Sequence, residues 1–70
     1  MESQTSKILA YLLEGKSITP IDALNKFGCM RLSARIKDLR DKGFDIATSM
    51  ETKEMPDGST KRYARYWLKG

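Results

Sequence analysis

The 70-residue sequence predicts an α+β fold with three short helices followed by a C-terminal two-stranded β-hairpin. Two stretches with helical apolar spacing are separated by a tight break at Gly28, and Gly43 follows the second stretch. Beyond it, β-branched, apolar and aromatic residues flank the turn sequence PDGS, residues 56–59. A chain of this length buries only about 60% of its unfolded surface. We therefore expect residues 1–70 to form a single domain around one small core.

The first helix is expected from about Thr5 to Glu14. Its apolar residues recur at i, i+1, i+4 and i+5, so they form one apolar stripe along the helix. The stripe consists of Ile8, Leu9, Leu12 and Leu13. Gly15 follows where many helices end in a left-handed residue. Residues 16–18 are too few for an independent strand, but they could pair at the edge of a sheet.

The second helix has the clearest start in the chain. Thr19 is a favourable N-cap, Pro20 suits the first helical position, and Asp22 places a carboxylate in the first turn. Gly28 is the natural left-handed residue to end this helix. The apolar face is expected to consist of Ile21, Leu24 and Phe27.

The third helix is expected after almost no loop, from about Met30 to Lys42. Cys29, which precedes it, is a poor N-cap by residue type. Apolar residues at i, i+4 and i+7 are expected to face the core. They are Leu32, Ile36 and Leu39. Gly43 again provides the stop.

Residues 44–68 read as a β-hairpin. Pro56 and Gly58 suit a turn, because proline presets φ and glycine adopts positive φ. Alternation in the second strand places three apolar or aromatic residues on one face, which we expect to be buried. They are Ala64, Tyr66 and Leu68. Trp67 lies on the opposite face, although its ring also favours burial.

The formal net charge of +4 is unevenly distributed along the chain. Residues 29–43 carry five basic residues against two acids, and residues 61–70 carry four basic residues and no acid. The segment between them, residues 44–60, has a net charge of −3. A basic balance of this kind favours polyanionic partners.

The outward side of the third helix suits a nucleic-acid groove. With Leu32, Ile36 and Leu39 facing inward, small side chains near the helix start and long basic ones point outward or lie on the flanks. A helix in the major groove needs short residues near base edges and donors that reach phosphates. The candidate DNA contacts on this helix are Arg31, Ser33, Ala34, Arg35 and Lys37. The same pattern also fits an ordinary solvated helix face. The stem of Arg35 could equally pack beside the core while its head pairs with an acid of the domain.

The hairpin offers further candidate DNA contacts near its turn. They are Lys53, Lys61 and Arg62. These cations could reach backbone phosphates. Alternatively, some cations of the second strand pair across the hairpin with acids of the first, because an acidic strand faces a basic one. The acids in question are Glu51, Glu54 and Asp57.

Two helices joined by a very short glycine turn form the supersecondary unit of helix-turn-helix proteins, and a hairpin directly after them is the layout of a winged helix. The segment TPIDALNKFGCMRLSARIKDLRDKGFDI resembles small phage and bacterial winged helix-turn-helix domains whose core reads A-L-x-x-F-G-x-M-R-L-x-x-R-I-x-x-L-R-x-x-G. The positions that this chain shares with the family pattern include Met30, Arg31, Leu32, Arg35 and Ile36. It implies DNA binding, often in the regulation of phages or mobile elements.

The expected function is therefore sequence-specific binding of double-stranded DNA by a small transcriptional regulator or an excisionase-like factor. In this interpretation the helix at about residues 30–42 enters the major groove, and the hairpin of residues 44–68 is the wing. No apolar run approaches the length of a membrane span, and the start of the chain lacks the layout of a signal peptide, so we expect a cytoplasmic protein. A homodimer or a protein partner would be compatible with so small a reading helix.

Other classes of function are distinguishable in principle. The chain has no histidine, Cys29 lacks a neighbouring base, and the acids form no metal-ligand pattern, so we expect neither an enzyme nor a cofactor. A protein-interaction module is the main alternative, because winged-helix folds can present the same surfaces to proteins. Such a contact would centre on Met50, Met55, Tyr63 or Trp67. RNA binding through stacking on the strand aromatics is a third possibility.

Overall fold

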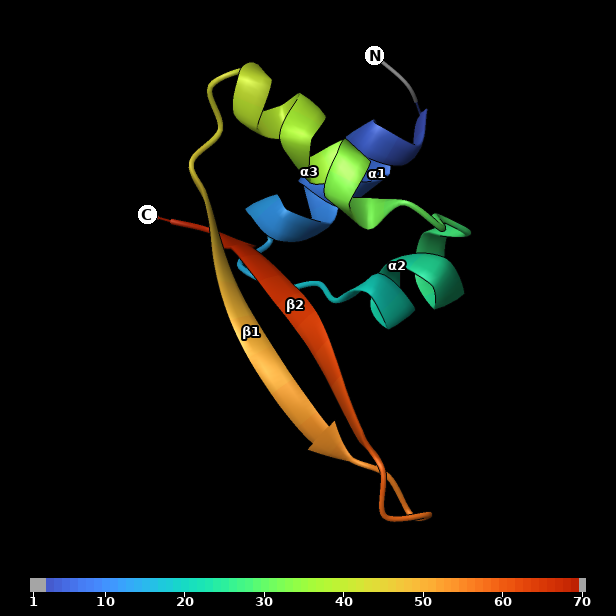
Figure 1. Ribbon diagram of the computed structural model, residues 1–70. Helices are drawn as coiled ribbons and strands as arrows, with labels where there is room; N and C mark the ends of the chain where they lie inside the picture. Colours follow the sequence, from blue (N-terminus) through green and yellow to red (C-terminus); the bar gives the residue numbers. More distant parts are fainter. Residues whose placement is uncertain (1–2, 70) are drawn as a thin grey trace.

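The computed structural model describes residues 3–69 and confirms the α+β fold (Figure 1). The elements in chain order are α1 (Ser3–Leu13), α2 (Pro20–Phe27), α3 (Leu32–Asp41), β1 (Ile46–Glu54) and β2 (Thr60–Leu68). The three helices gather at one end of the molecule, and the hairpin projects away from them (Figure 1). The resulting body is elongated, with principal extents of 40 × 25 × 19 Å.

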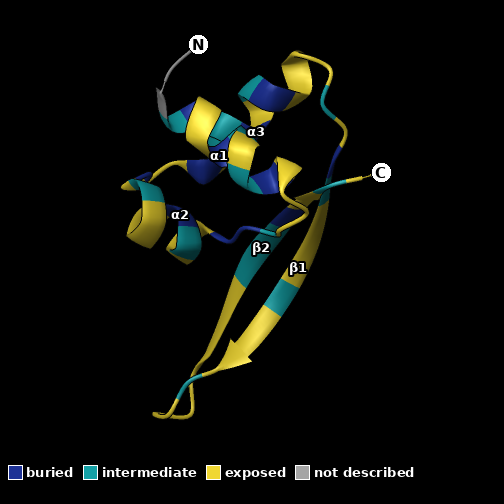
Figure 2. Cartoon of the chain, turned by 180° about the vertical axis from the view of Figure 1, so that it is seen from behind, coloured by how far each residue is buried: buried dark blue, intermediate teal, exposed yellow. Residues whose placement is uncertain are grey.

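The core lies between the helices and the base of the hairpin, and the outer half of the hairpin is largely exposed (Figure 2). Its buried hydrophobic residues are Ile8, Leu12, Ile18, Ala23, Cys29, Leu32, Ile36, Leu39, Ile46 and Tyr66. The inward stripe expected for the third helix is confirmed in full. The stripe of the first helix is confirmed in part, because Leu9 is half-buried and Leu13 remains 64% exposed.

The start of α2 is a capping box. The Thr19 hydroxyl accepts the Asp22 N–H at 3.3 Å, and the Asp22 carboxylate accepts the Thr19 N–H at 3.2 Å. These reciprocal bonds satisfy two backbone donors that a helix start otherwise leaves open. The chain direction at Thr19 is thereby fixed, immediately after the buried residue Ile18.

The expected apolar face of α2 is correct at Phe27 and wrong at Ile21 and Leu24. Ile21 and Leu24 are 62% and 44% exposed, whereas Ala23 is buried. Phe27 is half-buried and packs edge-on against Tyr11, with ring centroids 5.7 Å apart. Residues Ala23 and Phe27, four apart, lie on one side of the helix, and Ile21 and Leu24 point about 160° and 100° away from Ala23. The small residue therefore marks the contact side of α2, because it allows close approach to the helical body.

The turn between α2 and α3 begins at Gly28, which adopts φ 64° as expected. Its N–H donates to Leu24 O at 3.0 Å, and the Cys29 N–H donates to Ala23 O at 3.1 Å. This second bond carries Cys29 inward, where it is buried. The chain needs two further residues to turn, so α3 begins at Leu32 rather than Met30, and Met30 is 85% exposed.

The hairpin is closed as the PDGS sequence predicts. The Gly58 N–H donates to Met55 O at 2.9 Å, the Met55 N–H donates to Ser59 O at 2.7 Å, and Gly58 has φ 89°. A turn with proline second and a left-handed glycine fourth matches a common three-residue hairpin loop. The expected inward face is also confirmed, because Tyr66 is buried while Trp67 is 36% exposed.

Both edges of the hairpin are occupied at its base. On the β2 edge, Ile18 and Tyr66 exchange backbone hydrogen bonds of 2.8 and 2.9 Å, as expected for the short segment after α1. On the β1 edge, the Arg40 guanidinium donates to Ile46 O through Nε at 3.2 Å and Nη2 at 2.7 Å. Toward the tip, no further strand pairs with either edge within residues 3–69.

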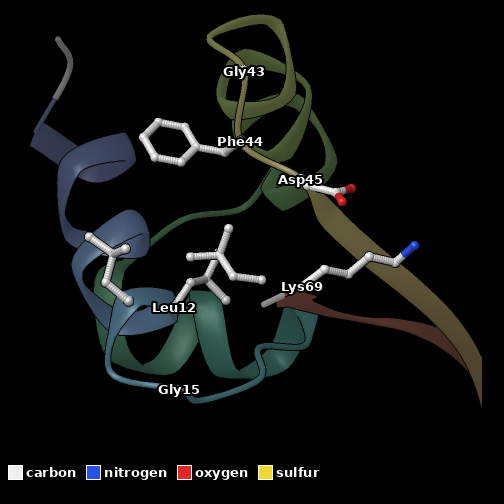
Figure 3. Close-up of a pocket in the computed structure, with 8 residues that line it drawn as sticks. Leu12, Gly15, Gly43, Phe44, Asp45 and Lys69 are labelled. Carbon is white, nitrogen blue, oxygen red and sulfur yellow. The ribbon is translucent and has the colours of Figure 1, made fainter.

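A hollow of about 360 Å³ lies between the end of α1, the Gly43–Asp45 connection and the end of β2 (Figure 3). The apolar part of its wall consists of Leu12, Leu13, Phe44 and Leu68. The charged ends of Asp45 and Lys69 extend away from it (Figure 3). It therefore resembles a gap in apolar packing more than a site with aligned polar groups.

Replacing Leu39 by alanine is expected to lower the free energy of unfolding by about 2–5 kcal/mol, because Leu39 is fully buried between the helices. Urea denaturation followed by circular dichroism measures the change. Leu13→Ala is the matched control, since its side chain is mostly exposed, and it should shift stability by less than about 0.5 kcal/mol. Equal effects of the two substitutions would contradict the observed orientation of the helices.

Candidate nucleic-acid interface

The outward side of α3 carries the residues that the sequence selected. Arg31, Ser33 and Lys37 are exposed and Ala34 is half-buried, while the opposite side of the helix supplies the core. The small residues Ser33 and Ala34 lie within the first turn, flanked by the basic residues. This arrangement offers close backbone approach in the middle and long donors beside it, as a major-groove helix requires.

The N-terminus of α3 strengthens the positive character of this surface. Arg31 occupies the N-cap position, and its side chain makes no capping hydrogen bond. The first turn closes through backbone bonds alone, from the Ala34 and Arg35 N–H groups to Arg31 O at 3.1 and 3.4 Å. The positive end of the helix dipole is therefore not compensated by a capping acid or hydroxyl, and the N-cap residue itself is an exposed arginine.

Arg35 differs from the other candidates on α3. Its side chain is largely buried, and Nη2 lies 3.5 Å from Asp38 Oδ2, one helical turn away. This geometry agrees with the alternative in which the stem packs beside the core and the head pairs with an acid. The structure thus brings Arg31, Ser33, Ala34 and Lys37 together and turns Arg35 toward its own helix.

Arg40 has a structural role that the sequence did not predict. Besides Ile46 O, its Nη2 donates to Thr48 Oγ1 at 2.6 Å, and the guanidinium lies 6.0 Å from the centre of the Tyr66 ring. One side chain at the end of α3 therefore holds two residues of β1 and borders the hairpin's buried aromatic. The planar fork of arginine suits such a multiple contact better than lysine would. The sequence signalled only a basic residue in the last helical turn.

The cations of the hairpin divide between its two faces. The register pairs Lys53 directly with Lys61, and it pairs Arg62 with Thr52 on the opposite face. All three cations are exposed. The expected cross-strand neutralisation occurs at Arg65, whose Nε lies 3.0 Å from Glu51 Oε2. The hydrogen bond with Glu51 raises the pKa of Arg65. Its Nη1 also donates to Ser17 Oγ at 2.9 Å.

The tip of the hairpin is ordered by an aspartate. Asp57 Oδ1 accepts the Ser59 hydroxyl at 2.6 Å and the Ser59 N–H at 3.0 Å. These hydrogen bonds lower the pKa of Asp57, because they favour the ionised carboxylate. The Asp57 carboxylate therefore forms its hydrogen bonds within the turn and not with the neighbouring lysines.

No group of three or more Cys, Asp or Glu side chains within residues 3–69 is arranged to hold a metal ion. None of the helices described is long and apolar enough to cross a membrane.

The architecture and the exposed basic helix together define a class of protein, the winged helix-turn-helix domains. A family model described as a winged helix-turn-helix domain matches residues 3–70. The chain therefore belongs to this family, and the resemblance found in its sequence is confirmed. A search of curated proteins gave no match.

Removing the Arg40 side chain is expected to loosen the hairpin relative to α3. Arg40→Ala deletes the hydrogen bonds to Ile46 O and Thr48, and it should lower the free energy of unfolding by about 1 kcal/mol. Hydrogen exchange of the Ala47 and Trp67 amides at the hairpin base should accelerate. Arg62→Ala serves as the control, because this exposed arginine lies toward the tip. Unchanged exchange in Arg40→Ala would show that Arg40 does not hold the hairpin.

The carboxyl group of Asp57 is expected to titrate below the usual range for aspartate. Because the folded-state pKa is lowered, its stabilisation of the turn is fully present above the unfolded pKa and is lost as pH falls through the folded pKa. Carboxyl carbon NMR across acid pH measures the titration. Ser59→Ala removes the hydroxyl donor and should raise the pKa of Asp57. An unshifted Asp57 in this variant would contradict the hydrogen bond.

Proposed function

We propose that the protein binds double-stranded DNA sequence-specifically, with α3 in the major groove and the hairpin as the wing. The observation that carries the proposal is the outward side of α3. It combines Arg31 and Lys37 with the small residues Ser33 and Ala34, at a helix start that lacks a side-chain cap. Membership of the winged helix-turn-helix family supports the same function.

The individual contacts follow from reach and chemistry. Arg31 and Lys37 are long enough to contact base edges or phosphates, and arginine favours bidentate contact with guanine. Ser33 and Ala34 allow the helix to lie close to the base pairs. On the wing, Lys53, Lys61 and Arg62 supply charge for backbone phosphates without reading sequence. Arg35 contributes mainly through its packing and its ion pair with Asp38.

The hydrogen-bonded junction between α3 and the wing supports simultaneous contact by both elements. Arg40 bonds the end of α3 to β1, and the Ile18–Tyr66 pair holds the other hairpin edge. A wing fixed in this way does not have to be ordered on binding, which reduces the entropic penalty of association. The lysines and arginines of both elements then act as one electrostatic surface.

The biological role that best suits such a protein is a small transcriptional regulator or an excisionase-like factor of phage or mobile-element type, acting in the cytoplasm. The pattern of residues 19–46 supports this role. A ten-residue helix reads few base pairs, so we further propose that binding to paired half-sites as a homodimer provides specificity.

DNA binding is tested by titrating a labelled random-sequence duplex and following fluorescence anisotropy. Contact with about five phosphates predicts a slope of about −4 to −5 for the logarithm of affinity against the logarithm of salt concentration. Arg31→Ala and Lys37→Ala are each expected to weaken binding several-fold at ~50 mM salt while leaving the fold intact. Lys7 is an exposed lysine on α1. Lys7→Ala removes the same charge from a different helix and should have little effect on DNA binding.

Two results would count against the proposal. Absence of binding at low salt would mean that the basic side of α3 is only a solvated surface. Equal weakening by Lys7→Ala and Arg31→Ala would mean that binding depends on overall charge rather than on α3.

A further inference from the structure

A second hollow, distinct from the outward side of α3, lies between the start of α2 and one face of the hairpin. Its volume is about 470 Å³. We refer to it as the α2–wing groove. The residues that determine its chemistry are Pro20, Ile21, Lys53, Met55, Lys61 and Tyr63. They combine apolar surface from both elements with two lysines from the hairpin.

The apolar part of the groove is accessible. Ile21 is 62% exposed although it belongs to a helix that contributes to the core, and Met55 and Tyr63 are only half-buried. Leu24, one turn further along α2, is also 44% exposed. The orientation of α2 is fixed by its capping box and by Ala23, so Ile21 cannot turn inward. Neighbouring exposed apolar side chains beside a concave surface are typical of a site that binds another molecule.

The charged part of the groove lacks a counterion in the fold. Lys53 and Lys61 are direct cross-strand partners, and like charges in this relation destabilise a hairpin. Three acids near the groove have partners elsewhere: the Asp22 carboxylate accepts the Thr19 N–H, Glu51 pairs with Arg65, and Asp57 accepts two hydrogen bonds from Ser59. Within residues 3–69, neither lysine forms an ion pair. A carboxylate between the two ammonium groups would relieve their repulsion.

We propose that the α2–wing groove binds an acidic peptide segment of a partner protein, with an apolar side chain packed against Ile21, Met55 and Tyr63. A DNA phosphate could satisfy the lysines, but the sugar–phosphate backbone offers no large apolar side chain that could pack against those three residues. An acidic peptide with an apolar anchor matches both halves of the groove. Lys53 and Lys61 are also the proposed phosphate contacts of the wing, so the peptide and DNA compete for these two lysines. The proposal goes beyond DNA binding because it gives Ile21 a role in ligand binding, whereas Ile21 belongs neither to the core nor to the outward side of α3.

The test uses the full chain as bait in a selection from random twelve-residue displayed peptides. Selected peptides are expected to be enriched in Asp and Glu together with Leu, Ile or Phe. Synthetic copies should shift the backbone amide NMR signals of Ile21, Lys53, Lys61 and Tyr63. The double variant Lys53→Ser with Lys61→Ser, and separately Ile21→Ser, should each weaken their binding at least tenfold.

Matched controls separate the groove from general charge and hydrophobicity. Lys7→Ser with Lys69→Ser removes the same charge elsewhere, and Leu13→Ser removes an equally exposed apolar side chain from α1. Both should leave peptide binding unchanged, and circular dichroism verifies that every variant is folded. A selection without acidic and apolar enrichment would overturn the proposal, as would equal weakening by groove and control variants. The proposal would also be wrong if duplex DNA shifted the amide signals of the groove residues and no selected peptide did. The groove would then be a contact for DNA phosphates.

Discussion

The backbone pair between Ile18 and Tyr66 is the constraint on which the arrangement of the molecule depends. It joins the connection after α1 to the outer edge of β2, and both residues are buried. Because Thr19 caps α2 directly after this pair, the same two hydrogen bonds determine where α2 begins and where the hairpin base lies. The position of the wing relative to the helices, and the α2–wing groove between them, both follow from that single junction.

Arginines and lysines have different tasks in this chain. Arg35, Arg40 and Arg65 contact an acid, backbone carbonyl or hydroxyl of the protein, and each draws elements or turns of the fold together. Their planar, multiply donating heads are suited to such contacts. Arg31, Lys37, Lys53, Lys61 and Arg62 instead present their charge to solvent. The net charge therefore overstates the number of cationic side chains that can contact a polyanion. The location of each cation matters more than the total charge.

Local signals in the sequence predicted most of the fold. Gly28, Gly43 and Gly58 adopt positive φ where the chain turns, Thr19 caps α2, and the i, i+4, i+7 spacing identified the buried side of α3. The outward candidates on α3 follow from that phase. The apolar face of α2 could not be predicted in the same way. Ala23 is buried because a small residue allows α2 to pack closely against other helices, and not because it is strongly hydrophobic. Arg40 was missed because its acceptors lie on a strand whose position only the tertiary structure reveals.

The open edges of the outer hairpin have a consequence for self-association. Away from its base, each strand of the two-stranded ribbon leaves one row of backbone donors and acceptors facing solvent, which is a template for the addition of a strand from another molecule. Lys53, Glu54, Lys61 and Arg62 place formal charges along this stretch, and ionic side chains of this kind hinder edge-to-edge stacking. The wing cations therefore oppose edge-to-edge association of the hairpin, in addition to attracting any ligand. Binding by variants that lack several of these cations should therefore be measured in dilute solution. Aggregation is then not mistaken for a loss of binding.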